Sequence, residues 1–474
     1  MMPVRYLPAP ISVSLGCDEA TLHLRAPRRF QQASSDGHVL DDVMPPQLSS
    51  HPAMQALVSA RSAQPDNATT HRELAEAARR LGSPPAVEAY LWSAAILYDP
   101  GDSYLAIRYA NALKDRAEEL SNSSNHVLHR ASQVKSLAAF KRVLSFGDRL
   151  EWPAKKLALA HANVGGILYK LGRFKECESS FRSSVSLLPL LRESIGKSAA
   201  LAPRPTREVA ARQSRELLQV LHGLDMCLLQ QGKRKRAREV QDLGVSLGLW
   251  KVPEQRPHTL AEGILACAWH RPAAYGRVVS LLEAEASRIW LELKGLLRLR
   301  EVGDARETSA WYQDTEHIAA RPSQWLRRRL ACEVGPGSDD DDHGAEATPV
   351  TCAAITAAAR WYGGEDAVGF EGALFSLLAA GSHVRSHTGP TNERVAVSLG
   401  LANVEGAFLR VGRHSPPRQW REGKAHVFDD SFEHEVIHEG NSARAVLILH
   451  LRHPMLMPDS AQCPVRLTAK DPCG

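Results

Sequence analysis

The chain has 474 residues, 44% hydrophobic and 23% charged, which is long enough for two or three domains with sizeable cores. Its net charge of +5 is too small over this length to indicate nucleic-acid binding. No run of about eighteen apolar residues occurs, and residues 1–20 lack the apolar core of a secretory signal. We therefore expect no membrane span, and a cytoplasmic location is favoured.

The eight cysteines are dispersed, without the Cys-x-x-Cys spacing of zinc or redox sites. Cys177 and Cys227 fall at helix positions that suit a small apolar residue, so we expect buried thiols there. The whole set is compatible with a reducing compartment.

The first part of the chain reads as disorder followed by helices. Residues 1–50 are rich in Pro, Ser, Gln and Asp without periodicity, which predicts a disordered segment. Residues 52–250 show a helical pattern that repeats. Its clearest unit, residues 161–189, has small and apolar residues at the offsets of a tetratricopeptide repeat. In this unit Gly165 would let two helices approach closely and Gly172 would make the turn between them.

A second unit spans roughly residues 218–249, and residues 89–100, 104–114 and 132–150 read as further helices. The sequence thus predicts an all-α, tetratricopeptide-like solenoid whose concave surface binds an extended peptide. A generic helical bundle is the alternative. The basic run 233–236 is interpreted as a solvated helix face rather than a nucleic-acid patch.

Beyond the helical part, residues 250–257 contain two prolines and form a stiff connector. One apolar stripe predicts a helix over residues 274–297. Residues 335–349 hold four adjacent aspartates flanked by glycines and read as an exposed loop. A cation-binding run is the disfavoured alternative, because contiguous side chains cannot all converge on one ion.

From Ala373 onward the hydrophobic period changes to two, which predicts strands separated by short turns. Strands of this kind without long helices between them indicate an antiparallel sandwich or barrel. The candidate strands are residues 372–378, 393–401, 406–412, 424–428, 432–438 and 443–452.

The candidate site is in this last region. His387 and His434 lie 47 residues apart, and Arg444 follows ten residues later within an apolar strand. Imidazoles hold Fe(II) while leaving positions open for other ligands, and a guanidinium suits a carboxylate that must be held in one orientation. Because the chain has twenty histidines, an incidental pair is the competing interpretation.

Two runs carry a resemblance to a known family. His-Thr-Gly-Pro-Thr-Asn, residues 387–392, and Phe-Asp-Asp-Ser-Phe-Glu-His-Glu-Val, residues 428–436, closely resemble the metal-ligand motifs of the aspartyl/asparaginyl β-hydroxylases, which are Fe(II)/2-oxoglutarate-dependent dioxygenases. The resemblance implies a double-stranded β-helix, or jelly roll, over residues 251–460, followed by a tail at 461–474. The expected fold class is therefore α+β and multidomain, with the helical solenoid first and the jelly roll second.

The same resemblance implies roles for individual residues. His387 and His434 match the metal ligands, and Arg444 matches the arginine that grips the distal carboxylate of 2-oxoglutarate, assisted by Ser376. Arg394 matches an arginine that faces the substrate. The implied cofactors are Fe(II), 2-oxoglutarate as cosubstrate, and O2.

Three positions need comment. The third ligand of most such dioxygenases would fall at Gly389, but this family manages with two histidines and water. The family usually has arginine and histidine where this chain has Ala396 and Ser398. Ser398 can still contribute a hydrogen bond to the cosubstrate, whereas Ala396 cannot.

Other polar residues near the motifs are expected to have structural roles. Asp429 and Asp430 are interpreted as residues that orient the loop, and His383 and His438 as non-ligands. The family also has a disulfide that ends at the position of Cys352. Here the nearest upstream cysteine, Cys332, lies twenty residues away across the acidic loop, so this pairing stays open.

The sequence thus favours a dioxygenase that hydroxylates the β-carbon of Asp or Asn in a protein or peptide presented by the repeats. The alternatives are a repeat-containing binding protein with weak or no activity, and a hydroxylase of a non-protein substrate such as a lipid acyl chain. No nucleic-acid partner is expected.

Overall fold

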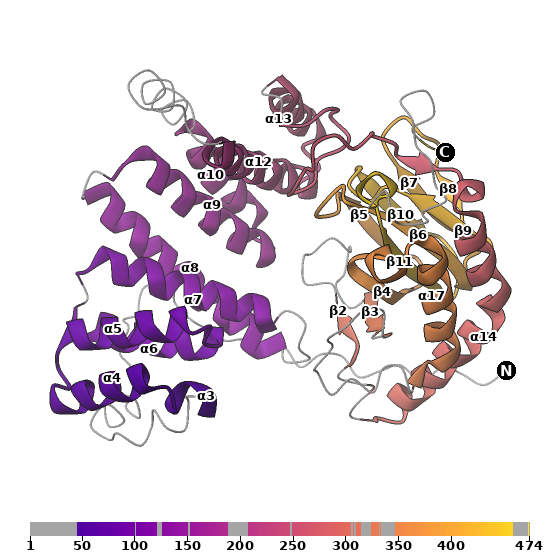
Figure 1. Cartoon of the computed structure of the whole chain (residues 1–474). Helices are drawn as coiled ribbons and strands as arrows, with labels where there is room; N and C mark the ends of the chain where they lie inside the picture. Colours follow the sequence, from indigo (N-terminus) through magenta and orange to yellow (C-terminus); the bar gives the residue numbers. More distant parts are fainter. Residues whose placement is uncertain are drawn as a thin grey trace. The chain divides into compact units, whose positions relative to one another are not determined.

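Helices form the first half of the chain, and antiparallel strands with two long helices form most of the second half (Figure 1). The chain divides into two compact units, Met1–Gly101 and Asp102–Gly474. The computed structural model describes residues 45–99, 101–120, 126–149, 152–187, 207–246, 249–304, 307, 310–313, 324–330, 332, 347–457 and 473. Most of the segment predicted to be disordered, the acidic loop and the tail lie outside these residues, as do Cys17 and Cys463.

The described residues of the first unit form four helices, of which the last three are long. Asn67 caps α5 because its side-chain oxygen accepts hydrogen bonds from the backbone N–H groups of Thr69 and Thr70. Leu74 on α5 and Trp92 on α6 are almost wholly buried. The bounds are α3 Pro46–Ser49, α4 Pro52–Ala63, α5 Ala68–Arg80 and α6 Pro85–Tyr98.

The helices of the second unit pack in sequence, each against the next. Gly172 and Gly232 occupy the turns of the last two helix pairs with φ of +74° and +69°, the left-handed region that glycine adopts without a Cβ penalty. The bounds are α7 Ser103–Glu119, α8 His126–Arg149, α9 Ala154–Lys170, α10 Phe174–Ser186, α12 Arg207–Gln230 and α13 Arg234–Ser246.

The close helix approach predicted for Gly165 is present. The ring of Phe181 on α10 packs against Gly165 on α9 and Gly223 on α12, where a Cβ would collide with it. The prediction of free, buried thiols is wrong, however, because Cys177 and Cys227 form a disulfide that links α10 to α12. Their helix spacing identified the burial correctly, but a pattern within one helix carries no information about the cysteine that faces it.

The strands form two antiparallel sheets. The larger has the order β1-β9-β6-β11-β4-β3-β2 and the smaller β5-β10-β7-β8. The bounds are β1 Trp269–His270, β2 Tyr312–Gln313, β3 Trp325–Leu330, β4 Val368–Leu378, β5 His383–His387, β6 Arg394–Ala402, β7 Ala407–Val411, β8 Arg418–Gln419, β9 Ala425–Phe428, β10 His434–His438 and β11 Arg444–Arg452.

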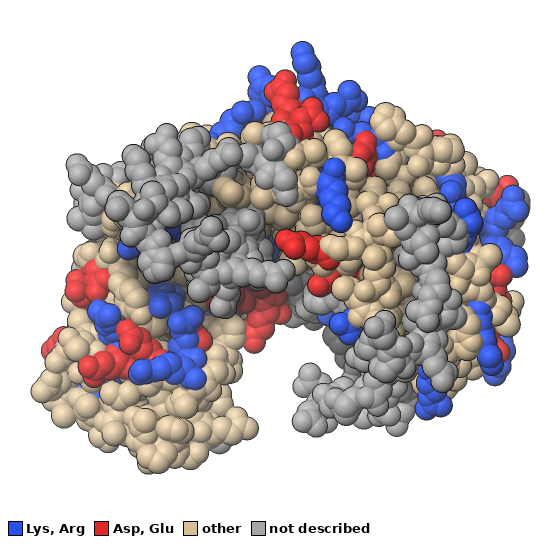
Figure 2. Space-filling model, turned by 45° about the horizontal axis from the view of Figure 1, so that its top comes forward, with Lys and Arg blue, Asp and Glu red and all other residues tan. Residues whose placement is uncertain are grey.

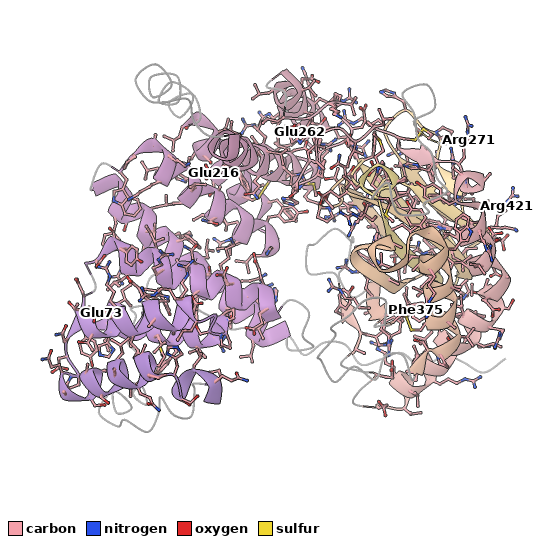
Figure 3. The ribbon with its side chains drawn as sticks, in the orientation of Figure 1. Glu73, Glu216, Glu262, Arg271, Phe375 and Arg421 are labelled. Carbon is pink, nitrogen blue, oxygen red and sulfur yellow. A yellow bond between two sulfur atoms is a disulfide. The ribbon has the colours of Figure 1, made fainter. Side chains whose placement is uncertain are left out.

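Alternation of side chains separates two cores. Odd-numbered residues of β6, such as Val397 and Leu399, pack under α14 (Gly276–Glu301) and α17 (Pro349–Tyr362), which cover the outer face of the larger sheet. Phe375 lies in this outer core (Figure 3). A second core fills the space between the sheets, with Ala396 and Val446 from the larger sheet and Val384 and Val436 from the smaller.

The apolar stripe predicted for residues 274–297 is confirmed, since it is the buried face of α14. All six predicted strand regions contain a strand, but β3, β5 and α17 were not predicted. The alternating pattern fails in β3 because its arginines fall on both faces. It fails in β5 because four of its five residues are polar.

Two further disulfides pair Cys267 with Cys473 and Cys332 with Cys352. The second answers the question that the sequence left open, because Cys332 bonds to Cys352 in α17. Within the described residues, no helix is both long enough and apolar enough to span a membrane.

The predicted basic helix face at the start of α13 is exposed at Arg234, Lys235 and Arg236, and Lys233 pairs with Glu178 at 2.6 Å. On the face drawn in Figure 2, basic side chains are interspersed with acidic ones. This is the pattern of a solvated surface.

Candidate active site

His387 and His434 face each other across neighbouring strands. They are direct partners in the β5–β10 ladder, and their ring centroids lie 4.1 Å apart. The Nδ1 of His387 is 2.7 Å from the carbonyl oxygen of Arg385, and the Nδ1 of His434 is 2.9 Å from that of Phe432. Donation from Nδ1 to a carbonyl fixes the tautomer and leaves Nε2 of each ring as the nitrogen with a free lone pair.

The environment also keeps both rings neutral. Burial, assisted by the neighbouring His434, lowers the pKa of His387 to about 3. Burial lowers the pKa of His434 as well. Neutral imidazole is the form that ligates a metal, so this pair is ready to bind one without first losing a proton.

At Gly389, the position where a third protein ligand would fall, the Asp430 carboxylate occupies the space of a side chain. Gly389 follows His387 by two residues, and a Cβ there would lie 2.6 Å from Oδ2 of Asp430. The site therefore has room for the Asp430 carboxylate only because residue 389 has no side chain. Among the described residues, no group of three His, Cys, Asp or Glu side chains is arranged to hold a metal ion.

Arg394, predicted to face substrate, is paired with Asp430. Its Nη2 lies 2.6 Å from Oδ2, and its Nε also donates to the same carboxylate. Burial acts to raise the pKa of Asp430, but Arg394 outweighs that effect and the pKa is lowered. Arg394 thus holds the acid beside the histidine pair, and a role toward substrate would be additional to this contact.

Arg444 enters the space between the sheets from β11. It is 2% exposed, its Nη2 donates to Oγ of Ser376 at 3.1 Å, and its guanidinium lies over the ring of Trp420. Its Nε has no hydrogen-bond partner among the described residues. Burial lowers the pKa of Arg444 to about 9. A buried guanidinium without an acid is costly, and a bound carboxylate would remove that cost.

Trp325 connects the histidine pair with the arginine. Its Nε1 donates to Oγ of Ser376 at 2.9 Å, and its ring centroid lies 6.4 Å from that of His387. Arg327, two residues on, packs over the Trp325 ring at 4.5 Å. Sequence reasoning missed both residues because β3 was not recognised as a strand.

The inner face of β6 is as the sequence predicts. Ser398 is buried, and its Oγ lies 3.2 Å from Nε1 of Trp420, which donates to it. The hydroxyl can still donate one hydrogen bond. Ala396 packs in the core between the sheets, so it supplies no charged group there.

The remaining polar residues of the motifs have other partners. Nε2 of His383 lies 3.2 Å from Glu435, and Nε2 of His438 lies 2.7 Å from the Ser442 carbonyl. The Asp429 carboxylate accepts from the backbone and side chain of Ser431. Each of these contacts stabilises local structure, which agrees with the interpretation that these residues are not metal ligands.

Fold and site together define an α+β protein in which two antiparallel sheets enclose a pair of neutral imidazoles and a buried arginine. Residues 284–454 match the model of the family described as aspartyl/asparaginyl beta-hydroxylase. The matched residues include His387, His434 and Arg444, so this part of the chain is similar to that family.

Individual relatives are similar over parts of the chain. The aspartyl/asparaginyl beta-hydroxylase of Mus musculus is 30% identical over 241 residues, which is 48% of this chain and 29% of that protein. The Homo sapiens protein of the same name is 29% identical over 246 residues, 48% of this chain and 28% of its own. Aspartate beta-hydroxylase domain-containing protein 2 of Mus musculus is 41% identical over 88 residues, 18% of this chain and 25% of its own. The chain thus spans less than a third of each of these relatives.

Proposed function

We propose that this protein is an Fe(II)- and 2-oxoglutarate-dependent dioxygenase that hydroxylates the β-carbon of Asp or Asn in a protein or peptide. The observation that carries the proposal is the convergence of two groups between the sheets. The smaller sheet supplies two neutral imidazoles with Nε2 available, and the larger supplies a buried guanidinium that has no acid partner among the described residues. We assign the double-stranded β-helix of these dioxygenases to the two sheets and tetratricopeptide-like repeats to the helices.

The residues fit the cofactors in donor chemistry and in charge. His387 and His434 would hold Fe(II), and the absence of a third protein ligand leaves positions for the cosubstrate and oxygen. Arg444 and Ser376 would hold the distal carboxylate of 2-oxoglutarate, with Ser398 donating to its other end. When bound, Fe(II) together with 2-oxoglutarate and O2 supplies the oxidising chemistry of hydroxylation, which yields succinate and CO2.

The helices of the second unit offer a place for a peptide. A cavity of about 380 Å³ lies among α7, α8, α9 and α12 and extends to Thr388, the residue after His387. Its wall carries both signs of charge, from Lys114, Lys170 and Glu216. A groove of mixed charge that ends beside the histidine pair suits an extended polar peptide whose Asp or Asn reaches the metal.

The three disulfides bear on the compartment. Structural disulfides persist in oxidising environments and are rare in the cytosol. We therefore propose an oxidising compartment in place of the cytoplasm favoured by the sequence.

The direct test is turnover by the purified full chain with Fe(II), 2-oxoglutarate and a library of Asp- and Asn-containing peptides. We expect succinate formation coupled to a gain of one oxygen on an Asp or Asn side chain, located by tandem mass spectrometry. His387→Ala is the inactive control. Absence of both succinate formation and 2-oxoglutarate binding would refute the enzyme assignment.

A second candidate function is binding without turnover. The observation that favours it is the inner face of β6, where Ala396 adds no charge and the Ser398 hydroxyl already accepts from Trp420. The two functions differ in one result: a binding protein would take up metal and peptide but form no succinate.

A further inference from the structure

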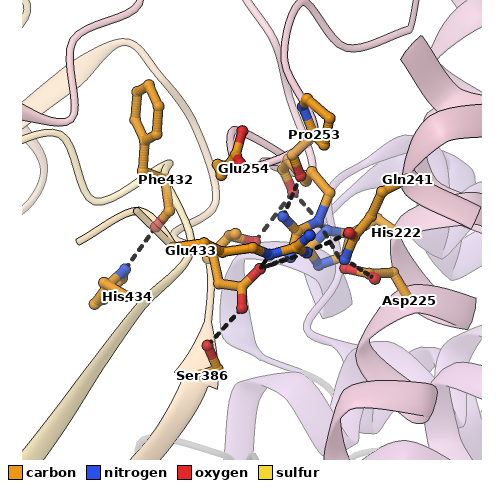
Figure 4. Close-up of polar contacts among 12 residues, drawn as sticks. His222, Asp225, Gln241, Pro253, Glu254, Ser386, Phe432, Glu433 and His434 are labelled. Carbon is orange, nitrogen blue, oxygen red and sulfur yellow. Dashed lines mark hydrogen bonds and ion pairs between the residues drawn. The ribbon is translucent and has the colours of Figure 1, made fainter. Parts of the chain in front are cut away.

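Arg256 is a wholly buried arginine in the connector between α13 and β1. Its partners His222, Asp225 and Glu433 are drawn in Figure 4. Its backbone joins both histidine motifs. Its N–H donates to the Ser431 carbonyl at 3.2 Å, and its own carbonyl accepts from Oγ1 of Thr388 at 3.0 Å. Its side chain donates from Nη2 to Oε2 of Glu433 at 2.9 Å.

These partners lie next to the proposed metal ligands in sequence. Thr388 follows His387 directly, and Glu433 precedes His434 directly. Glu433 is held further by Ser386, whose Oγ donates at 2.8 Å, and by Arg413 at 3.0 Å. One buried residue therefore fixes the backbone on one side of each histidine.

The same arginine also binds helix α12. Its Nε donates to Oδ2 of Asp225 at 2.7 Å, and its carbonyl accepts from Nδ1 of His222 at 2.7 Å. His222 and Asp225 are three residues apart and so lie on one face of the helix. Asp225 is 0% exposed and accepts a second hydrogen bond from Gln241 on α13.

Arg256 is the cation that links the two acids of this network. Asp225, Arg256 and Glu433 form a chain of one buried cation between two largely buried anions. Loss of Arg256 would leave Asp225 a buried anion beside Gln241 and would remove one of the two guanidinium partners of Glu433, so both segments would be free to shift. The Glu433 segment ends at His434, so such a shift would move a metal ligand.

We propose that Arg256 is a positioning residue for the His387–His434 pair, and that helix α12, through Asp225 and His222, is part of the support of the metal site. The inference rests on the proposed function only in requiring that this pair binds metal. It adds that a helix of the repeat region, remote in sequence from both histidines, controls metal affinity. The cavity that contains His222 and Thr388 then ends on two residues that share the Arg256 carbonyl.

The test is calorimetric titration of the full chain with Mn²⁺, without substrate, in the wild type, Arg256→Gln, Asp225→Asn and the double variant. Outer partners of metal ligands typically change affinity about 10–100-fold. We expect a loss of this order for Arg256→Gln and a smaller loss for Asp225→Asn. The double variant should lose less than the product of the single losses, because both changes break one network.

Arg328→Gln is the matched control. Arg328 is 5% exposed and forms a two-point contact with Glu307, but it lies on the face of β3 opposite Trp325. It should lower the melting temperature and leave Mn²⁺ affinity unchanged.

The outcomes separate the two proposals. A wild type that binds no Mn²⁺ would refute the metal site and with it this inference. A wild type that binds, with folded variants of unchanged affinity, would refute the inference alone, as would equal losses in Arg328→Gln. If Arg256→Gln does not fold, the near-isosteric Asp225→Asn decides.

Discussion

His387 and His434 are directly opposed residues of an antiparallel ladder, and their Nδ1 atoms both contact carbonyl oxygens of the backbone two residues earlier. The site is thus made by strand pairing and needs no specialised loop. Because each ring is oriented by its own strand, the separation of the rings is set by the register of β5 on β10.

The first prediction concerns the metal. His387→Ala and His434→Ala should each remove high-affinity divalent metal binding, because only two protein donors are available and neither can be spared. His383→Ala is the matched control, since it lies on the same strand but contacts Glu435 and is half-exposed. Metal content after dialysis, measured by atomic emission, gives the answer. A full metal complement in either variant would contradict the ligand assignment.

The second prediction separates function from stability at Arg444. Arg444→Met should weaken 2-oxoglutarate binding by about 1.5–3 kcal/mol, the value of hydrogen bonds to a charged group. The same change should leave the free energy of unfolding of the ligand-free protein unchanged or raised, because it removes a buried cation that meets no acid in the part of the chain that the structure describes. Calorimetry with 2-oxoglutarate and urea unfolding measure the two effects. A large loss of stability with normal binding would reverse the assignment.

The third prediction uses neighbouring glycines of α9. Gly165→Ala places a Cβ 2.6 Å from Cδ2 of Phe181, so it should destabilise by about 1–3 kcal/mol through overpacking. Gly166→Ala meets nothing within 4 Å and should stabilise by about 0.5–1 kcal/mol through helix propensity. Urea unfolding of the two variants side by side tests the packing. Equal effects would show that the helices do not approach at Gly165.

These contrasts show what could be read from the sequence. Alternation alone predicted that Val395, Val397 and Leu399 face away from the site. Helical spacing predicted the buried stripe of α14. The resemblance supplied His387, His434 and Arg444, which composition could not rank among twenty histidines and many arginines.

The residues that were missed share a physical reason. Trp325 contributes through β3, whose arginines obscure its alternation, and Arg256 lies in a proline-containing connector that reads as a linker. Arg256 is buried because acids from α12 and from the segment before His434 meet it, at sequence separations of 31 and 177 residues. Pairings over such distances leave no local periodicity.

The fourth prediction concerns acid stability of the helical region. Burial acts to raise the pKa of Glu178, but hydrogen bonds from Lys233 and Arg182 outweigh it and lower the pKa to about 2. Because the folded pKa lies below the ordinary 4.5, this acid stabilises the fold above about pH 4.5 and loses that effect as the pH falls toward 2. The stability difference between wild type and Glu178→Gln should therefore shrink across this range.

Chemical unfolding at a series of pH values between 7 and 2.5 measures this difference. Glu176→Gln is the control, since its partner Arg173 forms an exposed ion pair of small value. A difference for Glu178→Gln that stays constant down to pH 2.5 would show that the cluster does not hold the carboxylate in its charged form.

The fifth prediction concerns the disulfides, on which sequence and structure disagree most. Cys177 and Cys227 are both 0% exposed, and the bond between them joins α10 to α12, the helix that carries Asp225.

Protein purified without reductant should yield three linked peptide pairs on digestion: Cys177–Cys227, Cys267–Cys473 and Cys332–Cys352. Reduction should lower the free energy of unfolding by about 2–4 kcal/mol per bond, because the unfolded chain regains freedom. Under non-reducing conditions Cys177→Ser should already show the share of this loss that belongs to its own bond, and reduction should then cost it only the share of the Cys267–Cys473 and Cys332–Cys352 bonds. If instead both cysteines react with a thiol reagent after unfolding in the absence of reductant, they are buried thiols, and the oxidising compartment loses one of its three supports.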